Sequence, residues 1–533
     1  MLPMAEEGMQ QSAEELGIAT ARSGTVFVLS KVGGAAVTLM LLIFLTRYLR
    51  PADYGIYTLA VAFATLLGAG GNFGIGTALR KKLPEEKAEM KRRLGIISNA
   101  YAVSTLIALA ISIAGIVLSG TIATHVYGNS SMAAPLEVAS VIVLLTVLFN
   151  ITIAVLVGLD MIKESAISNV TYTVIQLFAT VILVALGYGV LGAMAGLAAG
   201  LLIGLILAFA YVAARGYARA VMPSVKVARE LTRFSAPVVV ANIVASGTTS
   251  FAIAFLGVFA GAAVVGSFGA AYKLGRIVEL VLTSTTFVLL PAFSKMFASE
   301  HLARRVSSIY GSSIYYMLLL LLPVLAWMVG AATPLTRLLF SSAYSSAPFY
   351  FAVIAIGTAV GVIGSFAATL IIGNGDTKRF MRYQVIVVVA EVAMLLAFVP
   401  LYKAIGVLVA MFVIAPIFFD ALYLRALREQ FGLRLDMRRL ASVALAAGVT
   451  GAVMLGIVIA MHGRYLSILA TAAVDLLLYP ALVVLFRGVG RRNIEFVRSI
   501  GKRFGMLYAP MNAMLRYAEL FMPKEGEAQR PPK

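Results

Sequence analysis

GSFGAAYKLGRIVELVLTSTTFVLLP, residues 266–291, is an apolar stretch of membrane-spanning length that carries three charged side chains. At about 1.5 Å of rise per residue, Lys273, Arg276 and Glu279 lie on one face of a helix, near its middle. A charge at the centre of a bilayer costs about 2.5–3.5 kcal/mol on the insertion scale, so such groups usually face a polar interior. An ion pair between Arg276 and Glu279 would hold helices together, but it would not neutralise the charge of Lys273. We therefore expect a net positive face toward a cavity that accepts an anion.

The composition is that of a polytopic membrane protein. Of the 533 residues, 61% are hydrophobic and 13% are charged, whereas about a quarter of the residues of a soluble domain are charged. No Cys is present, which excludes disulfides, thiol catalysis and Cys-ligated metals. The three His residues fall in predicted loops, so we expect no metal site and no cofactor.

Apolar stretches of spanning length recur along the chain after the polar tail 1–22, and we count fourteen of them. We predict an all-α protein with fourteen transmembrane helices. The predicted spans are 23–46, 56–79, 94–118, 135–158, 166–186, 191–214, 235–258, 266–291, 309–331, 347–372, 383–400, 405–424, 441–461 and 466–486.

The basic residues alternate between the two sides of these spans. With Met1 in the cytoplasm, 35 of the 43 Lys and Arg residues fall in cytoplasmic segments, five in outer loops and three within spans. This bias predicts a cell-membrane protein with both termini in the cytoplasm. The net charge of +19 is then mainly a topology signal, with affinity for anionic lipid headgroups rather than nucleic acid.

The chain contains a faint internal repeat. Gly55–Tyr57 corresponds to Gly266–Phe268 at an offset of 211, and the turn Gly158–Lys163 resembles the turn Gly373–Lys378. Because each repeat holds an even number of spans, two six-helix lobes related by a pseudo-two-fold axis along the membrane normal are expected. The predicted organisation is a cytoplasmic tail (1–22), an N-lobe (23–214), a cytoplasmic linker (215–234), a C-lobe (235–424), a final helix pair (441–486) and a basic amphipathic cytoplasmic tail (487–533).

Four segments in order, residues 45–81, 265–297, 338–347 and 372–380, resemble a known family. They read LTRYLRPADYGIYTLAVAFATLLGAGGNFGIGTALRK, VGSFGAAYKLGRIVELVLTSTTFVLLPAFSKMF, LLFSSAYSSA and IGNGDTKRF. They are similar to polysaccharide (oligosaccharide-lipid) flippases of the multidrug/oligosaccharidyl-lipid/polysaccharide exporter superfamily. The resemblance implies two lobes in a V shape, alternating access, and export of a lipid-linked sugar to the outer leaflet. The last two helices resemble the extra pair of fourteen-span flippases, where they are thought to form a lipid groove.

Candidate substrate-binding residues are those that place charge or amide groups inside the spans. A phosphate-bearing headgroup needs cations that replace its lost hydration, and Lys31, Lys273 and Arg276 meet this need, although Lys31 could instead snorkel to the cytoplasmic face. Glu279 could tune Arg276 or carry a coupling cation. Asn242 belongs to a polar stripe suited either to sugar hydroxyls or to helix–helix hydrogen bonds.

Four further residues are candidates for coupling or gating. Glu391 and Asp475 lie near the middle of predicted spans, where each needs a partner or a proton. Arg47 and Asp53 flank the turn at Pro51, where they form either a gate ion pair or a structural turn.

The leading hypothesis is a monomeric flippase for a lipid-linked (di)phosphate oligosaccharide. One alternative is an organic-cation or drug exporter of the same superfamily, which would need an acidic cavity; another is a lipid II flippase. A membrane glycosyltransferase is a third hypothesis, but the short outer loops offer Asp53 almost alone, so we expect no catalysis.

Overall fold

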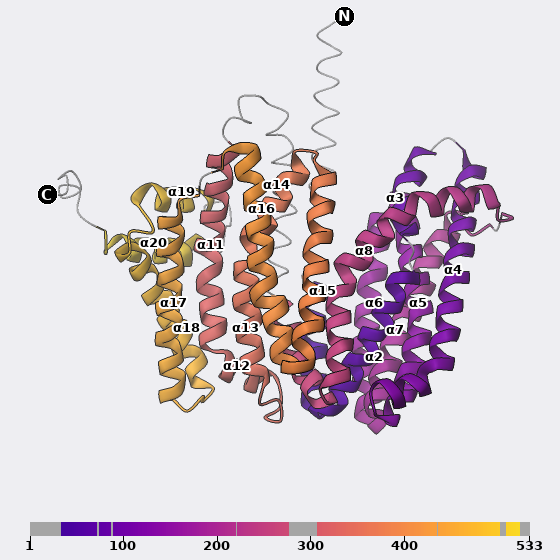
Figure 1. The fold of residues 1–533 in the computed structure, drawn as a ribbon, viewed down its shortest axis with the longest axis horizontal. Coiled ribbons are helices and arrows are strands. Elements are labelled where there is room, and N and C mark those ends of the chain that lie inside the picture. Colours follow the sequence, from indigo (N-terminus) through magenta and orange to yellow (C-terminus); the bar gives the residue numbers. More distant parts are fainter. Residues whose placement is uncertain are drawn as a thin grey trace, which may run out of the picture. The chain divides into compact units, whose positions relative to one another are not determined.

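The computed structural model describes residues 33–71, 74–86, 89–219, 221–276, 306–433, 435–501 and 508–522. Every regular element in these ranges is a helix, as predicted (Figure 1). Helices satisfy all backbone hydrogen bonds internally, which is what a segment in lipid requires.

Nine helical segments among the described residues are long and apolar enough to cross a membrane. Two of them, Ile162–Ala214 and Thr377–Phe431, contain 53 and 55 residues, and each holds two predicted spans. The described apolar helices Gly33–Tyr48 and Gly247–Phe259 are shorter. The count of fourteen remains a prediction, because the first and eighth predicted spans lie partly outside the described residues.

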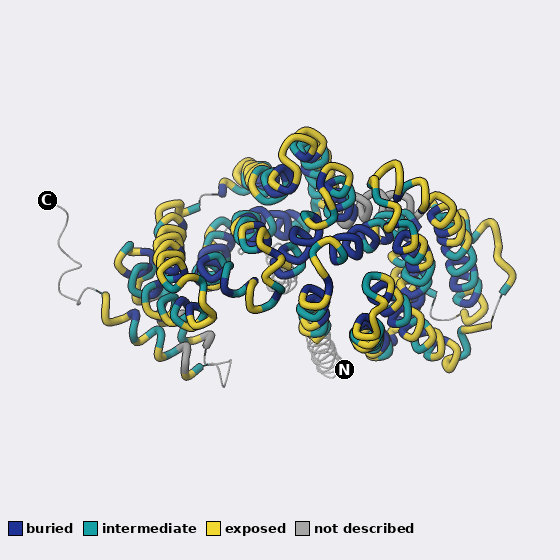
Figure 2. Tube along the Cα trace, turned by 90° about the horizontal axis from the view of Figure 1, so that it is seen from below, coloured by how far each residue is buried: buried dark blue, intermediate teal, exposed yellow. Residues whose placement is uncertain are grey.

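The chain forms two compact units, which we describe one at a time. Unit 1 comprises residues 1–270 and 388–407, and unit 2 comprises residues 271–387 and 408–533. This division by contacts differs from the lobes inferred from the repeat, whose boundaries stay a prediction. Many of the exposed side chains in each unit are apolar, such as Leu106 and Val117 in unit 1 and Leu469 in unit 2. Figure 2 shows where exposed and buried residues lie along the chain.

Unit 1 is built from helices joined by short turns. They are the helix Gly33–Tyr48, α2 (Pro51–Gly71), α3 (Ile75–Glu85), α4 (Met90–Thr121), α5 (Ala133–Gly158), α6 (Ile162–Leu183), α7 (Gly189–Ala214), α8 (Val225–Phe259), the first residues of a helix over 262–276, and residues 388–407 of α15 (Thr377–Leu408). The second predicted span is shorter than expected, since α2 ends at Gly71 and α3 begins after Gly74 (φ 64°). Helix α8 begins at Val225, inside the stretch predicted as a linker.

A glycine stripe brings α6 and α7 together. Glycines recur every fourth residue along α7, so they share one face, and an added Cβ at Gly196 would lie 2.2 Å from Thr180 Oγ1. A Cβ at Gly200 would lie 2.8 Å from Gln176 Cβ. Lipid is as apolar as the side chains, so helices associate in membranes through such close packing.

Unit 2 is arranged around α11 (Val306–Gly330). Its other helices are α12 (Ala332–Leu339), α13 (Ala347–Val360), α14 (Val362–Gly373), residues 377–387 of α15, α16 (Ala415–Phe431), α17 (Met437–Ala460), α18 (Leu466–Leu485), α19 (Arg491–Gly501) and α20 (Tyr508–Glu519). One buried cluster joins α11, α14, α16 and α17 through side chains that include Tyr310, Phe366, Tyr423 and Met454. Arg498 on α19 donates to Glu519 Oε1 on α20 at 2.8 Å, which ties the two short tail helices together.

The two turns that resemble each other in sequence have the same backbone conformation. In the first, Asp160 has φ 63°, and the amide of Met161 donates to Leu156 O at 2.8 Å. In the second, the corresponding Gly375 has φ 84°, and the amide of Asp376 donates to Ile371 O at 3.2 Å. These are the hydrogen bonds that close a helix end with a left-handed residue. The two turns therefore resemble each other in backbone structure as well as in amino-acid sequence.

The glycines that mark the repeat meet each other in unit 1. A Cβ on Gly55 would lie 1.8 Å from Ala262 O, and a Cβ on Gly266 would lie 1.9 Å from Pro51 O. The contact is reciprocal, because each glycine faces the residue four positions before the other. Helix α2 thus crosses the helix over 262–276 as two equivalent elements do at a local two-fold axis.

Candidate anion-binding site

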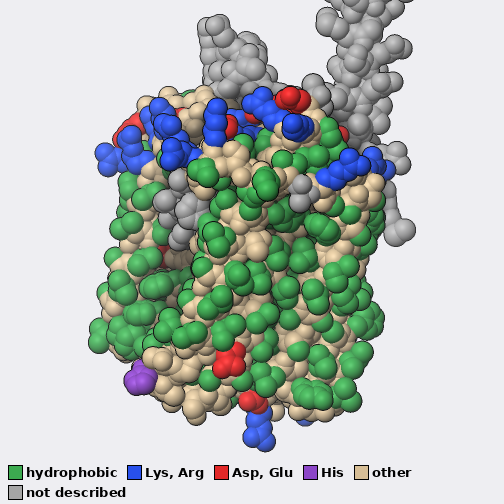
Figure 3. Space-filling view, turned by 90° about the vertical axis from the view of Figure 1, so that its right-hand side faces the viewer, with side chains coloured by type: hydrophobic (Ala, Val, Ile, Leu, Met, Phe, Trp, Pro, Cys, Tyr) green, Lys and Arg blue, Asp and Glu red, His purple; other side chains and the backbone are tan. Residues whose placement is uncertain are grey.

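Basic side chains gather at one end of unit 1. Figure 3 shows one face of the molecule, on which Lys and Arg collect at one end while hydrophobic side chains cover most of the rest. In unit 1 the sequence supplies them from α3 and from the first turns of α4 and α8, as Arg80, Lys81, Lys82, Lys91, Arg92, Arg93, Lys226, Arg229 and Arg233. This end carries the segments predicted to face the cytoplasm.

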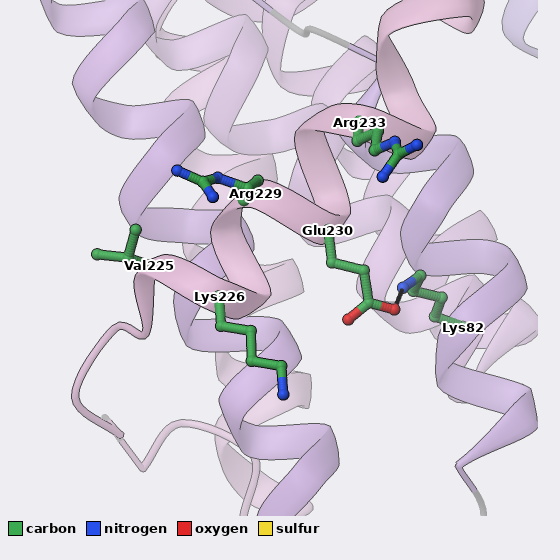
Figure 4. Close-up of a pocket in the computed structure, with 6 residues that line it drawn as sticks. All are labelled: Lys82, Val225, Lys226, Arg229, Glu230 and Arg233. Atoms are coloured by element: carbon green, nitrogen blue, oxygen red, sulfur yellow. Dashed lines mark hydrogen bonds and ion pairs between the residues drawn. The ribbon is translucent and has the colours of Figure 1, made fainter.

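A cavity of about 790 Å³ lies at this end between α3 and α8 (Figure 4). Lys82 of α3 lines it together with α8 residues, which are Val225, Lys226, Arg229, Glu230 and Arg233. The described lining holds four cations and one carboxylate, a formal charge of +3. The volume lies within the range of about 300–1,000 Å³ that small-molecule sites occupy.

The α8 side of the cavity follows from helical spacing. Lys226, Arg229 and Arg233 stand at i, i+3 and i+7, which places them along one face of a helix. Among the described residues, the side chains of Arg229 and Arg233 have no hydrogen-bond or ion-pair partner. Guanidinium groups present a rigid fork of N–H donors that matches phosphate oxygens.

Hydrogen bonds to α4 hold the start of α8 in place. The amide of Val221 donates to Ser98 Oγ at 3.0 Å, and the amide of Ser224 donates to Asn99 Oδ1 at 2.9 Å. Arg93 donates to the hydroxyl of Tyr217 at 2.8 Å. The wall that carries the cations is therefore anchored to the rest of unit 1.

An ion pair between Lys82 and Glu230 joins the two walls of the cavity. The hydrogen bond and charge of Lys82 lower the pKa of the Glu230 carboxyl from its ordinary value. A lowered pKa means that the pair is intact above the ordinary carboxyl pKa and is lost only as pH falls through the lowered value. Near neutral pH, Lys82 is thus partly neutralised, and Arg229 and Arg233 are the cations most available to a ligand.

The predicted cationic face is described only in part. Lys273 is half-buried on the helix over 262–276, and Arg276 is exposed one turn further on. An Arg276 N–H donates to the Tyr272 hydroxyl at 3.2 Å, and the guanidinium carbon lies 5.9 Å from the centroid of that ring. Lys31 and Glu279 lie outside the described residues, and for Asn242 only the helical backbone within α8 is described.

The coupling and gating candidates are spread over several helices. Glu391 is half-buried on α15. Asp475 on α18 has a buried Oδ1 with no hydrogen-bond partner among the described residues, beside an apolar cavity of about 310 Å³. Arg47 is exposed near the end of the helix Gly33–Tyr48, and Asp53 lies in the first turn of α2. A gate ion pair between them stays a prediction.

Sequence reasoning assigned the residues of the basic cavity to topology alone. The spacing of Lys226, Arg229 and Arg233 is the signal in the sequence that marks them as one helix face, within the stretch predicted as a linker. The polar residues Tyr172 and Gln176 of α6 have a packing role, because a Cβ on Gly204 would meet Tyr172 Cβ at 2.8 Å and a Cβ on Gly200 would meet Gln176 Cβ at 2.8 Å. No group of three or more His, Asp or Glu residues suited to a metal occurs in the described ranges.

Comparison with known proteins places this fold among membrane transporters. A family model described as "Polysaccharide biosynthesis protein" matches residues 20–297, which is just over half of the chain. No curated protein sequence matches the chain significantly.

Solved structures share the fold at low sequence identity. The lipid II flippase MurJ in an inward closed conformation is 15% identical with a TM-score of 0.72, covering 87% of this chain and 98% of its own. A multidrug resistance MATE family transporter of the MOP superfamily, inward-facing, is 14% identical with a TM-score of 0.60 and coverages of 75% and 94%. An outward-facing MATE family transporter is 16% identical with a TM-score of 0.53 and coverages of 77% and 95%.

Proposed function

Since the chain belongs to the polysaccharide biosynthesis protein family, we propose that it is a flippase that moves a lipid-linked (di)phosphate oligosaccharide from the cytoplasmic to the outer leaflet of the cell membrane. In this proposal both termini and the basic end of unit 1 face the cytoplasm. The protein acts as a transporter, without a chemical step of its own.

The basic cavity between α3 and α8 is the observation that carries the proposal. The described lining has a formal charge of +3, which exceeds in magnitude the negative charge of a diphosphate diester. The cavity could therefore hold such a headgroup whether or not the sugar is charged. Charge-assisted hydrogen bonds from Arg229 and Arg233 would replace the hydration that the phosphates lose on leaving water. The ion pair between Lys82 and Glu230 weakens the attraction of the cavity for the phosphates, which favours release of the headgroup at the outer leaflet.

We propose that this cavity binds the headgroup and that Lys273 and Arg276, predicted from the sequence to lie near mid-membrane depth, also contact it during transport. The fold supports such a path, because relatives of this fold have been solved both inward-facing and outward-facing. Alternating access then carries the headgroup past the bilayer centre while the lipid tail stays in the hydrocarbon.

A second candidate function is export of organic cations. The likeness to MATE family transporters favours it, as does the buried carboxylate oxygen of Asp475, which lacks a partner among the described residues. It is the weaker proposal because a cation exporter would repel its substrate at the basic end. The likeness to MurJ supports a lipid II headgroup as a further variant of the flippase proposal.

The test is translocation of a fluorescent lipid-diphosphate oligosaccharide in proteoliposomes. Each lost hydrogen bond to a charged group costs about 1.5–3 kcal/mol, so we expect Arg229→Gln together with Arg233→Gln to lower headgroup affinity roughly tenfold or more. The matched control is Arg425→Gln, which removes an exposed arginine paired with Glu429 at 2.9 Å and should leave transport unchanged. Glu230→Gln frees Lys82 and should tighten binding, most strongly at low salt.

The outcomes separate the alternatives. Transport that survives the double substitution would remove the cavity from the path and leave the family assignment standing. Lys273→Ala and Arg276→Ala, assayed in the same vesicles, test the predicted deeper site in the same way. Absence of lipid movement by wild type, with saturable binding of organic cations, would favour the exporter.

A further inference from the structure

Two cavities of opposite character adjoin each other in unit 2. The first, of about 250 Å³, is polar and is lined chiefly by the start of α11, the start of α17 and Asn493 of α19. The second, of about 310 Å³, is apolar and lies among α11, α18, α19 and α20. Asn493 lines both cavities, so they meet at this side chain.

The two cavities follow one another along α11. Ser308, Ser312 and Tyr315 face the polar cavity, and Leu319 and Pro323 face the apolar one. At about 1.5 Å per residue, the step from Ser312 to Pro323 is about 17 Å along the helix. The polar cavity lies at the end of α11 that begins the span, and the apolar cavity lies deeper. This is the order in which a phospholipid places its headgroup and its acyl chain.

Hydrogen bonds of Tyr315 form the wall that the two cavities share. The Tyr315 hydroxyl donates to Gly488 O at 2.6 Å and accepts from Asn493 Nδ2 at 2.9 Å. Tyr479 of α18 donates to Leu319 O at 2.9 Å below this level. These bonds fix α11, α18 and the start of α19 around the shared wall, so the site is built by tertiary contacts rather than by one helix.

Among the described residues, the charges that line the polar cavity are one of each sign. Arg439 Nε lies 3.1 Å from Asp436 Oδ2, and this contact leaves the terminal N–H groups of the guanidinium for a phosphate. The Asp436 carboxylate can accept from an ammonium group, and the serine hydroxyls and the Asn493 amide can accept from or donate to a glycerol backbone. The described lining carries no net charge, and such a lining matches a headgroup with no net charge better than it matches an anionic one.

We infer that unit 2 binds one zwitterionic glycerophospholipid, with its phosphate and ammonium at Arg439 and Asp436 and one acyl chain in the cavity below α19 and α20. The lipid fills the space between the last helix pair and the tail helices, and it holds the tail helices on the membrane. This is a site for a resident bilayer lipid, separate from the proposed transport path.

The test uses the full-length protein, delipidated in detergent. Native mass spectrometry and thermal unfolding are followed during titration with phosphatidylethanolamine or phosphatidylglycerol. Gly311 lines the polar cavity, and a Cβ built on it meets nothing within 4 Å, so the longer side chain of Gly311→Leu starts in open space at the proposed headgroup site. The matched control is Gly456→Leu on α17, where an added Cβ likewise meets nothing within 4 Å.

We expect wild type and Gly456→Leu to retain one phosphatidylethanolamine and to be stabilised by it, as binding to the folded state requires. Gly311→Leu and Arg439→Gln should weaken this lipid's affinity by about tenfold or more while the unliganded proteins unfold at the wild-type temperature. Equal lipid retention by Gly311→Leu and the control would overturn the site. A preference for phosphatidylglycerol would overturn the headgroup assignment.

Discussion

Gly55 and Gly266 show how single residues determine the crossing of the repeated helices in unit 1. An added Cβ on either would lie within 2 Å of a backbone oxygen of the other helix. Backbone cannot rotate away as a side chain can, so the crossing requires glycine on both partners. The positions stand at the same place in the two repeats, which explains why the same residue appears twice.

We predict that Gly55→Ala and Gly266→Ala each destabilise the protein by about 1–3 kcal/mol or more, because either methyl group forces the two backbones apart. Thermal unfolding in detergent measures the effect. Gly68→Ala on the same helix α2 is the control, since its Cβ would meet nothing within 4 Å. The double substitution should cost less than the sum, as both act on one crossing. Additive effects would contradict a shared contact.

At the scale of elements, each half of the chain contains a long helical pair whose bend includes a residue with the same unusual backbone conformation. Gly189, where α7 begins, has φ 53° and ψ −128°. Lys403, within α15, has φ 51° and ψ −125°. Glycine adopts this region without strain, whereas a residue with a Cβ does not. The second half thus carries a strained residue where the first half has glycine.

Lys403→Gly should therefore stabilise the protein by about 1–2 kcal/mol, within the range of strain stored at such positions. The measurement is again the unfolding midpoint in detergent. Lys403→Ala keeps the Cβ and should change stability little, which separates strain from the loss of the exposed charge. Gly189→Ala should be destabilising. A Lys403→Gly variant no more stable than Lys403→Ala would rule out the strain.

At the scale of the whole molecule, the distribution of Lys and Arg predicts the orientation in the membrane. The chain has no Cys, so single cysteines can report the side on which a residue lies. Ser130, in a predicted outer loop, and Arg428, in a predicted cytoplasmic segment, are both exposed.

We expect Ser130→Cys to react with a membrane-impermeant maleimide in intact cells and Arg428→Cys to react only after permeabilisation. The unmodified chain, which cannot react, is the control. Labelling of Arg428→Cys in intact cells would reverse the orientation and with it the proposed direction of transport.

Much of the secondary structure could be read from the residues themselves. Long apolar segments bounded by charged residues predicted the helices. The turns at Asp160 and Gly375, which resemble each other in sequence, have the same left-handed backbone conformation. Boundaries were less accurate. Helix α2 ends at Gly71, and α3 begins after Gly74, whose left-handed conformation composition does not reveal. The linker is shorter than the predicted 215–234, because α8 starts at Val225 and continues without a break into its apolar part.

The candidate site was less accessible to sequence reasoning than the fold. Lys273 and Arg276 were noticed because charge is expensive in an apolar run. In the sequence, membrane topology alone explains Lys226, Arg229 and Arg233, because basic residues are common at the cytoplasmic ends of spans.

The sequence alone determined the membrane class, the helical fold and the repeat, because hydropathy and local turn chemistry act over a few residues at a time. Only the tertiary structure decided that Lys82 meets Glu230, 148 positions away, and that Gly55 meets Gly266. Such pairs depend on how separate helices pack, and in lipid that packing is governed by close surface fit rather than by a pattern visible along the chain.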